Sequence, residues 1–344
     1  MPCVHYGGLR NMVDLGSSRH ARPRDPAVSE GAAMSHDAAM SSLAIVVVNY
    51  GSSALLAENL APLARSTGAI VVVVDNFSTP EERVAVSRLA SAEGWTAVLS
   101  DSNPGFGAAM NTGVARSIEL GATRFLLLNP DATLSADAVD SLMQTITASP
   151  MTLVSPTILR PDGSVWFAGA DLYLEDGRIR SRARRDSRRT ATIMPWLSGC
   201  CLAVSKTLWD KVGGFDADFF LYWEDVDLSR RVVDAGGELL VAEDAVAIHA
   251  EGGTQRSGGL QSAATAKSPI YYYYNIRNRL LFAARHLDAP AIESWLRVAR
   301  PVAWEVLLQG GRRQFLSPIR PLDAARRALR DGRRIARDRL RSEN

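Results

Sequence analysis

Three short, mostly apolar runs, each followed at once by polar residues, constrain the fold of this chain most. Runs this short, rich in β-branched residues or leucine, are typical of strands buried on both faces of a sheet. They lie at Leu43–Val48, Ala69–Val74 and Arg124–Leu128, separated by segments of helical length at 54–66, 81–93 and 108–120. The alternation predicts an α/β fold, with a mostly parallel central sheet flanked by helices.

The second half of the chain continues this alternation less regularly. Residues 171–192 are rich in arginine and show no clear period, so we expect an exposed loop there. Residues 252–267 are rich in Gly, Ser, Thr and Gln, which is typical of a mobile loop. Further strands are expected at Leu153–Leu159, Trp196–Val204 and Glu238–Ile248, and helices at 136–148, 225–235 and 270–310.

Charge and hydropathy exclude several classes of protein. The 39 basic and 37 acidic side chains nearly balance, which argues against a general nucleic-acid binder. No run approaches the roughly 18 apolar residues of a membrane span. Residues 1–42 lack the apolar stretch of a signal peptide, so we expect a disordered leader. The three cysteines Cys3, Cys200 and Cys201 form no disulfide framework and indicate a reducing, cytoplasmic compartment.

Carboxylates and one histidine follow the predicted strands or begin a predicted helix. They are Asp131, the group Glu224, Asp225 and Asp227, and His249. Carboxylates and an imidazole at strand ends are what Mg²⁺ or Mn²⁺ needs to hold a diphosphate, with one carboxylate left as a base. The pattern therefore indicates chemistry on a nucleotide-sugar.

Six motifs in order resemble family 2 glycosyltransferases of the GT-A fold, in the branch of bacterial rhamnosyltransferases and galactofuranosyltransferase-like enzymes. They are Val46-Val-Val-Asn-Tyr50, Val73-Val-Asp-Asn76, Asn103-Pro-Gly-Phe-Gly-Ala-Ala-Met-Asn111, Leu127-Leu-Asn-Pro-Asp131, Gly213-Gly-Phe-Asp216 and Phe220-Leu-Tyr-Trp-Glu-Asp-Val-Asp227. The resemblance implies a Rossmann-like GT-A domain at 43–285, followed by a helical, basic extension at 286–344.

The resemblance also implies a nucleotide-sugar pocket at the first strand ends. Asp75 would accept the ring N–H of the base, with Asn49, Tyr50 and Asn76 beside it. The alternative is an ordinary strand-to-loop turn. The loop holding Asn103, Gly107 and Asn111 would pack under the nucleotide-sugar, or it is only a tight turn before a helix.

The implied metal site consists of Asp131 and His249. Asn129 stands where the family usually has the first aspartate of Asp-x-Asp, and its amide is a poorer ligand for the metal. The alternatives are an Asx-Pro turn at Asn129 and a structural role for the histidine.

In similar enzymes the aspartate of the Glu-Asp pair is the catalytic base, which here is Asp225. Glu224 would orient the acceptor, and close carboxylates raise one another's pKa. The alternative is a helix start, where acids interact well with the helix dipole. Trp196, Gly199 and Trp223 would form the acceptor wall, with core packing as the alternative for both tryptophans.

Two basic features remain. Arg277 follows the Gly/Ser-rich segment and is a candidate to close over the diphosphate. Residues 312–341 contain eleven arginines and three aspartates. This stretch is either a solvated helix or a peripheral membrane contact. In the second case the apolar positions Leu322, Ala325, Leu329, Ala336 and Leu340 lie on one face.

These observations predict an inverting glycosyltransferase. We expect it to move a sugar, with dTDP-rhamnose as the leading donor, to a hydroxyl of a cell-surface glycan or polyprenyl-linked acceptor at the cytoplasmic membrane face. The alternatives are a galactofuranosyl or other hexosyl transferase using a UDP-sugar, a non-catalytic glycan-binding protein, and a nucleotidyltransferase. The last would need a basic group near the first strand, and residues 49–53 contain none.

Overall fold

The computed structural model describes residues 42–183, 185, 190–250, 267–311 and 319–342. All of them belong to one compact unit, His36–Asn344. The expected leader, apart from its last residue, and the Gly/Ser-rich segment, apart from Lys267, lie outside the described residues.

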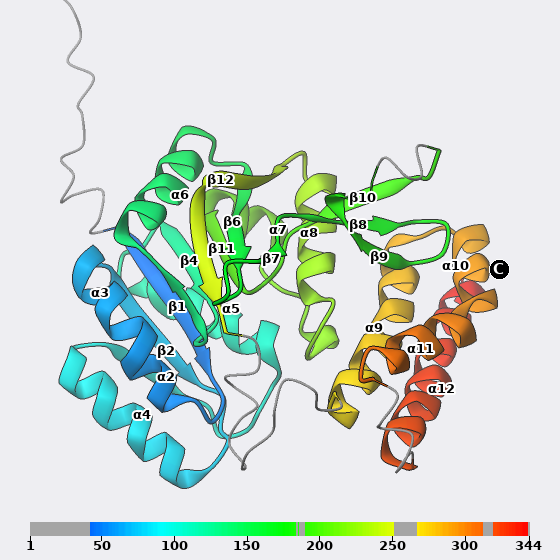
Figure 1. Cartoon of the computed structure of the whole chain (residues 1–344), viewed down its shortest axis with the longest axis horizontal. Helices are drawn as coiled ribbons and strands as arrows, with labels where there is room; N and C mark the ends of the chain where they lie inside the picture. Colours follow the sequence, from blue (N-terminus) through cyan, green and yellow to red (C-terminus); the bar gives the residue numbers. More distant parts are fainter. Residues whose placement is uncertain (1–41, 184, 186–189, 251–266, 312–318, 343–344) are drawn as a thin grey trace, which may run out of the picture. The chain divides into compact units, whose positions relative to one another are not determined.

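The first half of the main sheet is parallel, as the alternating pattern predicts (Figure 1). Its order is β3-β2-β1-β4, formed by β1 (Leu43–Asn49), β2 (Ile70–Asp75), β3 (Thr96–Leu99) and β4 (Arg124–Leu128). Every residue of β1 is buried, because strands lie on both its edges and helices cover its faces. The polar residues that follow β1, β2 and β4 therefore meet at one edge of the sheet.

Beyond β4 the sheet is mixed. β11 lies antiparallel to both β4 and β6, β12 is parallel to β6, and β5 and β7 are antiparallel additions. The bounds are β5 (Ala132–Leu134), β6 (Thr152–Leu159), β7 (Val165–Phe167), β11 (Cys201–Ser205) and β12 (Glu238–His249). The α/β prediction is confirmed, and the parallel strands are mainly those of the half formed by β3, β2, β1 and β4.

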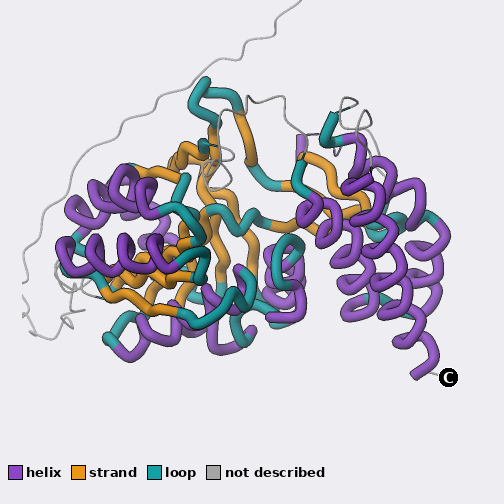
Figure 2. The backbone as a smooth tube through the Cα atoms, turned by 90° about the horizontal axis from the view of Figure 1, so that it is seen from below, coloured by secondary structure: helices purple, strands orange, loops and turns teal. Residues whose placement is uncertain are grey.

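Helices cover this sheet, as Figure 2 shows. α5 packs against β1 and β2, and α6 packs against β4, β11, β6 and β12. The approach of α5 is close, since a Cβ on Gly113 would overlap the side chain of Val46. The helices are α2 (Ser53–Leu55), η1 (Leu56–Leu60), α3 (Ala61–Thr67), α4 (Pro80–Glu93), α5 (Phe106–Glu119), α6 (Ala136–Ala148), α7 (Lys206–Val212), η3 (Ala217–Phe219) and α8 (Glu224–Asp234).

The arginine-rich stretch predicted as a loop instead contains a small antiparallel sheet. Its order is β10-β8-β9, from β8 (Ala170–Tyr173), β9 (Arg178–Ser181) and β10 (Ile193–Trp196). The loop prediction was wrong because the arginines have specific partners. Arg180 lies over the ring of Tyr173, and Arg185 pairs with the buried Asp171. Paired or stacked, an arginine packs its aliphatic stem and is compatible with a strand.

Four helices form the C-terminal part: α9 (Pro269–His286), α10 (Ala289–Arg297), α11 (Ala299–Leu308) and α12 (Ile319–Ser342). This agrees with the predicted helical extension, although α9 begins before residue 286. α12 packs along α9 through small residues, and a Cβ on Gly332 would lie 3.0 Å from the Leu280 side chain.

The apolar face predicted for a membrane contact is therefore occupied within the protein. Ala325 and Ala336 are buried, and Leu322, Leu329 and Leu340 pack against the same clusters. α12 hence exposes its arginines and not its apolar stripe. Among the described helices, none is long and apolar enough to cross a bilayer.

Candidate active site

The residues predicted to bind the nucleotide lie where β1 and β2 end. Asp75 is fully buried, and it accepts bonds from Asn49 Nδ2 (3.4 Å) and Arg83 Nε (3.4 Å). Burial raises the pKa of Asp75, and these two bonds partly offset that effect. Asn49 is also buried, whereas Tyr50 is half exposed. The three predicted residues thus lie together at the strand ends.

Glu82 on α4 is a further polar residue of this region that the sequence reasoning missed. Its carboxylate accepts bonds from Asn49 Nδ2 (3.1 Å) and from the Ser53 hydroxyl (2.9 Å). It also accepts from the backbone N–H of Ser53, so it ties the loop after β1 to α4. The capping residue Thr79 fixes the start of α4 and with it this carboxylate.

The loop after β3 connects the nucleotide side to the rest of the site. Asn76 Nδ2 donates to Asn103 Oδ1 (2.9 Å), which also accepts from the Gly105 N–H (2.9 Å). Gly105 has a φ of +99°, and a Cβ there would overlap the carbonyl oxygen of Phe220. The Phe106 N–H donates to that same oxygen (2.7 Å). The loop at 103–107 and the loop before α8 are therefore in direct contact.

Two residues predicted in this loop and its helix have partners within the protein. A Cβ on Gly107 would lie 2.8 Å from Phe215 Cβ, so close packing requires this glycine. The side-chain amide of Asn111 bonds both the N–H and the carbonyl of Phe215, each at 2.8 Å. Both residues fix the turn that precedes η3, and we do not carry them forward as direct donor contacts.

Asp131 and His249 lie together, although 118 residues separate them in the sequence (249 − 131). β5 pairs with β12 so that Ala132 is opposite His249. His249 Nε2 lies 3.2 Å from Asp131 Oδ1, and both residues are buried. Among the described residues His249 Nδ1 has no hydrogen-bond partner, and the contact of Asp131 Oδ1 with His249 Nε2 does not have the geometry of a hydrogen bond.

A buried carboxylate oxygen and a buried imidazole nitrogen without hydrogen bonds are groups that can ligate a divalent cation. Oxygen and imidazole ligands suit Mn²⁺, and Mg²⁺ accepts a carboxylate and completes its shell with water and phosphate oxygens. The described residues contain no group of three or more ligating side chains, so such a cation would need further ligands from the substrate. Asn129 is held by its backbone N–H, which donates to the Cys200 carbonyl (2.9 Å).

Asp225 occupies the first turn of α8. Its carboxylate accepts bonds from the N–H of Gly199 (3.0 Å) and from the N–H of Val226 (2.8 Å). Burial raises the pKa of Asp225 to about 6, although these bonds favour the charged form. The side chain remains partly exposed. A carboxylate that is ionised at neutral pH and accessible is suited to accept a proton.

Glu224 is more deeply buried than its neighbour. Burial, and then the charge of Asp225, raise the pKa of Glu224 well above its ordinary value. Its Oε2 has no hydrogen-bond partner among the described residues. Burial, and then the charges of Cys201, Asp131 and Asp225, raise the pKa of the Cys200 thiol, so this thiol is near both carboxylates. Asp225 is therefore near the pair formed by Asp131 and His249.

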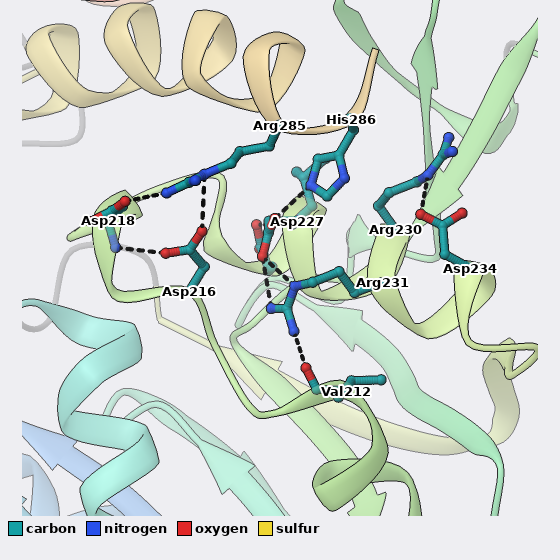
Figure 3. A network of polar contacts seen from close by, with 11 residues as sticks. Val212, Asp216, Asp218, Asp227, Arg230, Arg231, Asp234, Arg285 and His286 are labelled. Carbon is teal, nitrogen blue, oxygen red and sulfur yellow. Dashed lines mark hydrogen bonds and ion pairs between the residues drawn. The ribbon is translucent and has the colours of Figure 1, made fainter. Parts of the chain in front are cut away.

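Asp227 has a structural role. It accepts a bond from Arg231 Nε (2.9 Å), and its other oxygen lies 2.7 Å from His286 Nε2 on α9. Figure 3 shows this network and a second one, in which Arg285 pairs with Asp216 and Asp218. The first network connects α9 to α8, which carries the candidate base, and the second connects α9 to the turn at 216–218.

Only part of the predicted acceptor wall remains available. Trp223 is buried and packs on Phe282 and Trp295, so the structure favours the core-packing alternative for this residue. Gly199 acts through its N–H on Asp225. Trp196 is partly exposed, and its indole N–H has no partner among the described residues.

Trp166 on β7 was missed by the sequence reasoning. Its ring lies 4.5 Å from that of His249, measured between centroids. It also neighbours Phe167, whose ring lies 5.3 Å from Trp196. Phe167 is buried, whereas Trp166 and Trp196 are partly exposed, and an exposed tryptophan face is a surface that a sugar ring can stack on.

Arg277 contacts the loop before α8 instead of standing free near the strand ends. Its Nη1 donates to the Asp218 carbonyl (2.7 Å) and to Asn278 Oδ1 (2.7 Å). The closing motion over a diphosphate predicted for Arg277 would require these bonds to break. We therefore do not retain it as a donor contact.

Comparisons with known proteins point to one family. The family model described as "Glycosyltransferase like family 2" matches residues 41–268. The N-acetylglucosaminyl-diphospho-decaprenol L-rhamnosyltransferase of Mycobacterium tuberculosis is 29% identical over 234 residues, covering 60% of this chain and 75% of that protein. A dTDP-rhamnosyl transferase of Shigella flexneri is 22% identical over 247 residues, covering 72% and 81%.

Solved structures give a more distant similarity. A mannosyltransferase from Pyrobaculum calidifontis, in complex with GDP-Man and Mn²⁺, is 17% identical, with a TM-score of 0.49. The match covers 85% of each chain. This similarity is too low to support a conclusion about the site.

Proposed function

Because the chain belongs to the glycosyltransferase-like family 2 and is thus a hexosyltransferase, we propose that it transfers one sugar, with inversion, from a nucleotide-sugar to an acceptor hydroxyl. The observation that carries this proposal is the placement of Asp225. Asp225 lies at the start of α8, and its carboxylate accepts a hydrogen bond from the Gly199 N–H. Burial raises the pKa of Asp225 to about 6.

Asp225 would act as the general base. Its carboxylate takes the proton of the acceptor hydroxyl while that oxygen forms a bond to the anomeric carbon, and the bond to the nucleoside diphosphate breaks. A single displacement of this kind inverts the anomeric centre and needs no enzyme nucleophile. Glu224, whose pKa is raised first by burial and then by the charge of Asp225, would orient the acceptor.

Asp131 and His249 would hold a divalent cation, and Asn129 lies beside them as a weaker ligand. When bound, such a cation neutralises charge on the departing diphosphate. What supports this assignment is that the two side chains are buried and 3.2 Å apart, and that neither Asp131 Oδ1 nor His249 Nδ1 makes a hydrogen bond among the described residues.

The donor proposed is dTDP-rhamnose, since the Shigella flexneri relative is named for that donor and the Mycobacterium tuberculosis relative is an L-rhamnosyltransferase. Asp75 would accept the ring N–H of the base, beside Asn49, Tyr50 and Asn76. Asn103 would support the pocket from the next loop. A UDP-sugar is the second candidate, because thymine and uracil present the same ring N–H.

The acceptor proposed is a sugar on a polyprenyl diphosphate, by analogy with the name of the Mycobacterium tuberculosis relative. Trp166 and Trp196 would stack on its sugar rings.

A lipid-linked acceptor would bring the protein to an anionic membrane surface, peripherally and at the cytoplasmic face. The contact would use a basic face, defined as Arg300, Trp304, Arg333 and Arg337. Trp304 is half exposed, and the charges of Arg300 and Arg337 lower the pKa of Arg333 after burial, so the three guanidinium groups are close. Clustered arginines are attracted to anionic lipid headgroups.

A donor panel would test this function. We would measure binding and hydrolysis of dTDP-rhamnose, UDP-galactofuranose, UDP-glucose and GDP-mannose, with and without Mn²⁺, and the anomeric configuration of the product. We expect one donor to bind and be hydrolysed with inversion. Binding of a donor without turnover would favour a glycan-binding protein, and product with a retained anomeric configuration would contradict the mechanism.

A further inference from the structure

The loop that leads into the candidate base has an unfavourable backbone conformation. Phe220, Tyr222 and Trp223 have φ values of +53°, +65° and +73°. Bulky residues rarely adopt this left-handed region, because the Cβ atom crowds the backbone. Three such residues within four positions persist only where surrounding structure fixes them. α8 starts immediately afterwards, at Glu224.

Asn278 on α9 fixes this loop. Its side chain is fully buried, and its Nδ2 lies within hydrogen-bond distance of three carbonyl oxygens. These belong to Phe219 (2.6 Å), Leu221 (2.9 Å) and Tyr222 (2.7 Å). An amide nitrogen carries two hydrogens, so three acceptors share two donors. The Asn278 side chain therefore contacts three of the four carbonyls of residues 219–222.

The opposite side of the loop faces the nucleotide region. The Phe220 carbonyl, which Asn278 does not bind, accepts from the Phe106 N–H (2.7 Å). The loop is therefore held between Asn278 on α9 and the loop at 103–107. Whatever moves it also moves the first turn of α8, where Asp225 lies.

We propose that Asn278 is a positioning residue for the transfer reaction, holding the loop at 219–223 so that Asp225 faces the acceptor. The proposal rests on the proposed function, because it assumes that Asp225 is the base. Asn278 itself touches neither donor nor acceptor in this account, since its amide is engaged with the loop.

Other contacts dock α9, so the docking does not depend on Asn278. Trp223 packs on Phe282, and Asp227 contacts His286. Arg285 pairs with Asp216 and Asp218. Loss of the Asn278 amide should thus leave α9 in place and release mainly the loop. A purely structural residue would change stability alone, whereas a positioning residue changes turnover in the folded enzyme.

The experiment compares Asn278→Asp and Asn278→Ala with wild type, using whichever of the four panel donors wild type hydrolyses fastest. Asn278→Asp keeps the shape, removes the donors and places oxygens against the carbonyls. The matched control is Asn275→Asp, one turn earlier on α9, where the amide donates, among the described residues, to the Tyr271 carbonyl of its own helix (3.0 Å). We would measure the thermal midpoint, kcat and KM for the donor, well below the midpoint.

We expect both Asn278 variants to lower kcat at least about tenfold, with donor KM within about threefold, because a small misplacement of a reacting group is costly. Asn275→Asp should stay within about twofold of wild type in kcat. A folded Asn278→Ala with kcat within about twofold of wild type would overturn the proposal, and so would failure of both Asn278 variants to fold.

Asp225→Asn, measured in parallel, separates the two hypotheses. If Asp225→Asn keeps its activity, the proposed function itself fails. If Asp225→Asn is inactive while the Asn278 variants keep wild-type kcat, only the positioning role fails.

Discussion

The two halves of the candidate site are built differently. On the nucleotide side, Asp75 and Asn49 end neighbouring parallel strands, and their register alone places them side by side. On the transfer side, Asp225 lies on a helix after a loop with unfavourable φ values, and Asn278, 53 positions later (278 − 225), holds that loop. The first half is thus determined by the sheet, and the second depends on long-range contacts with α9.

The point where the halves touch should be the most sensitive to substitution. In Gly105→Ala the new Cβ would overlap the Phe220 carbonyl at a φ of +99°, so we expect a loss of about 3 kcal/mol or more in the free energy of unfolding. Gly121→Ala is the control, because Gly121 has a φ of +92° and nothing within 4 Å of its Cβ. That variant should cost about 1 kcal/mol.

Denaturant unfolding of both variants would measure the contribution of the contact between the two loops. Equal losses for Gly105→Ala and Gly121→Ala would mean that only the backbone conformation matters. The comparison of the two halves would then lose its physical link.

The pair formed by Asp131 and His249 offers a second test, on affinity for the metal. We expect His249→Ala to weaken Mn²⁺ binding about tenfold or more, because it removes one of two protein ligands. Calorimetric titration with Mn²⁺, in the presence of nucleoside diphosphate, would measure it. His286→Ala is the control histidine, since its partner is Asp227. Unchanged Mn²⁺ affinity in His249→Ala would remove this histidine from the site.

The pH dependence sharpens the assignment of the transfer half. A base must be deprotonated, so kcat should fall as the pH drops below about 6, where Asp225 with its raised pKa becomes protonated. Burial also raises the pKa of Glu224 beside it and of the Cys200 thiol. Turnover that remains flat down to pH 4.5, well below that value, would argue against Asp225.

The smallest expected effect concerns the basic face. Arg337→Ala should weaken binding to vesicles containing phosphatidylserine by about 1 kcal/mol, or about fivefold. Arg116→Ala on α5 is the control, because this arginine is also exposed but pairs with Glu119. Co-sedimentation at low and moderate salt would measure both. Equal binding of the two variants would exclude the basic face as the membrane contact.

Sequence reasoning worked where local patterns determine position. The buried strands that end at Asn49 and Asp75, and the strand that ends three residues before Asp131, follow from run length and from the polar residues after each run. The family resemblance grouped His249 with Asp131, and the pairing of β12 with β5 brings His249 opposite Ala132, next to Asp131. The helix that starts with Glu224 and Asp225 is also as predicted.

It failed where a residue's surroundings come from distant segments. Trp223 was predicted to form part of the acceptor wall, but it is buried against Phe282 of α9 and Trp295 of α10. Arg277 was predicted as a site residue because of its charge, whereas its uncharged neighbour Asn278 contacts the carbonyls of the loop before α8. No local pattern reveals that an asparagine will face three carbonyls of a loop nearly sixty positions away. Likewise, a loop was predicted where β9 lies, because the partners of the arginines after Asp171 are not visible in the sequence.

The most direct test of the account is donor binding and turnover in Asp225→Asn, compared with Asp234→Asn. Asp234 lies on the same helix, is partly exposed, and pairs with Arg230. We expect Asp225→Asn to bind the donor within about threefold of wild type and to lose turnover by about a thousandfold or more, as for removal of a general base. Asp234→Asn should retain both. Turnover by Asp225→Asn within tenfold of wild type would contradict the assignment of the base and, with it, the division of the site into two halves.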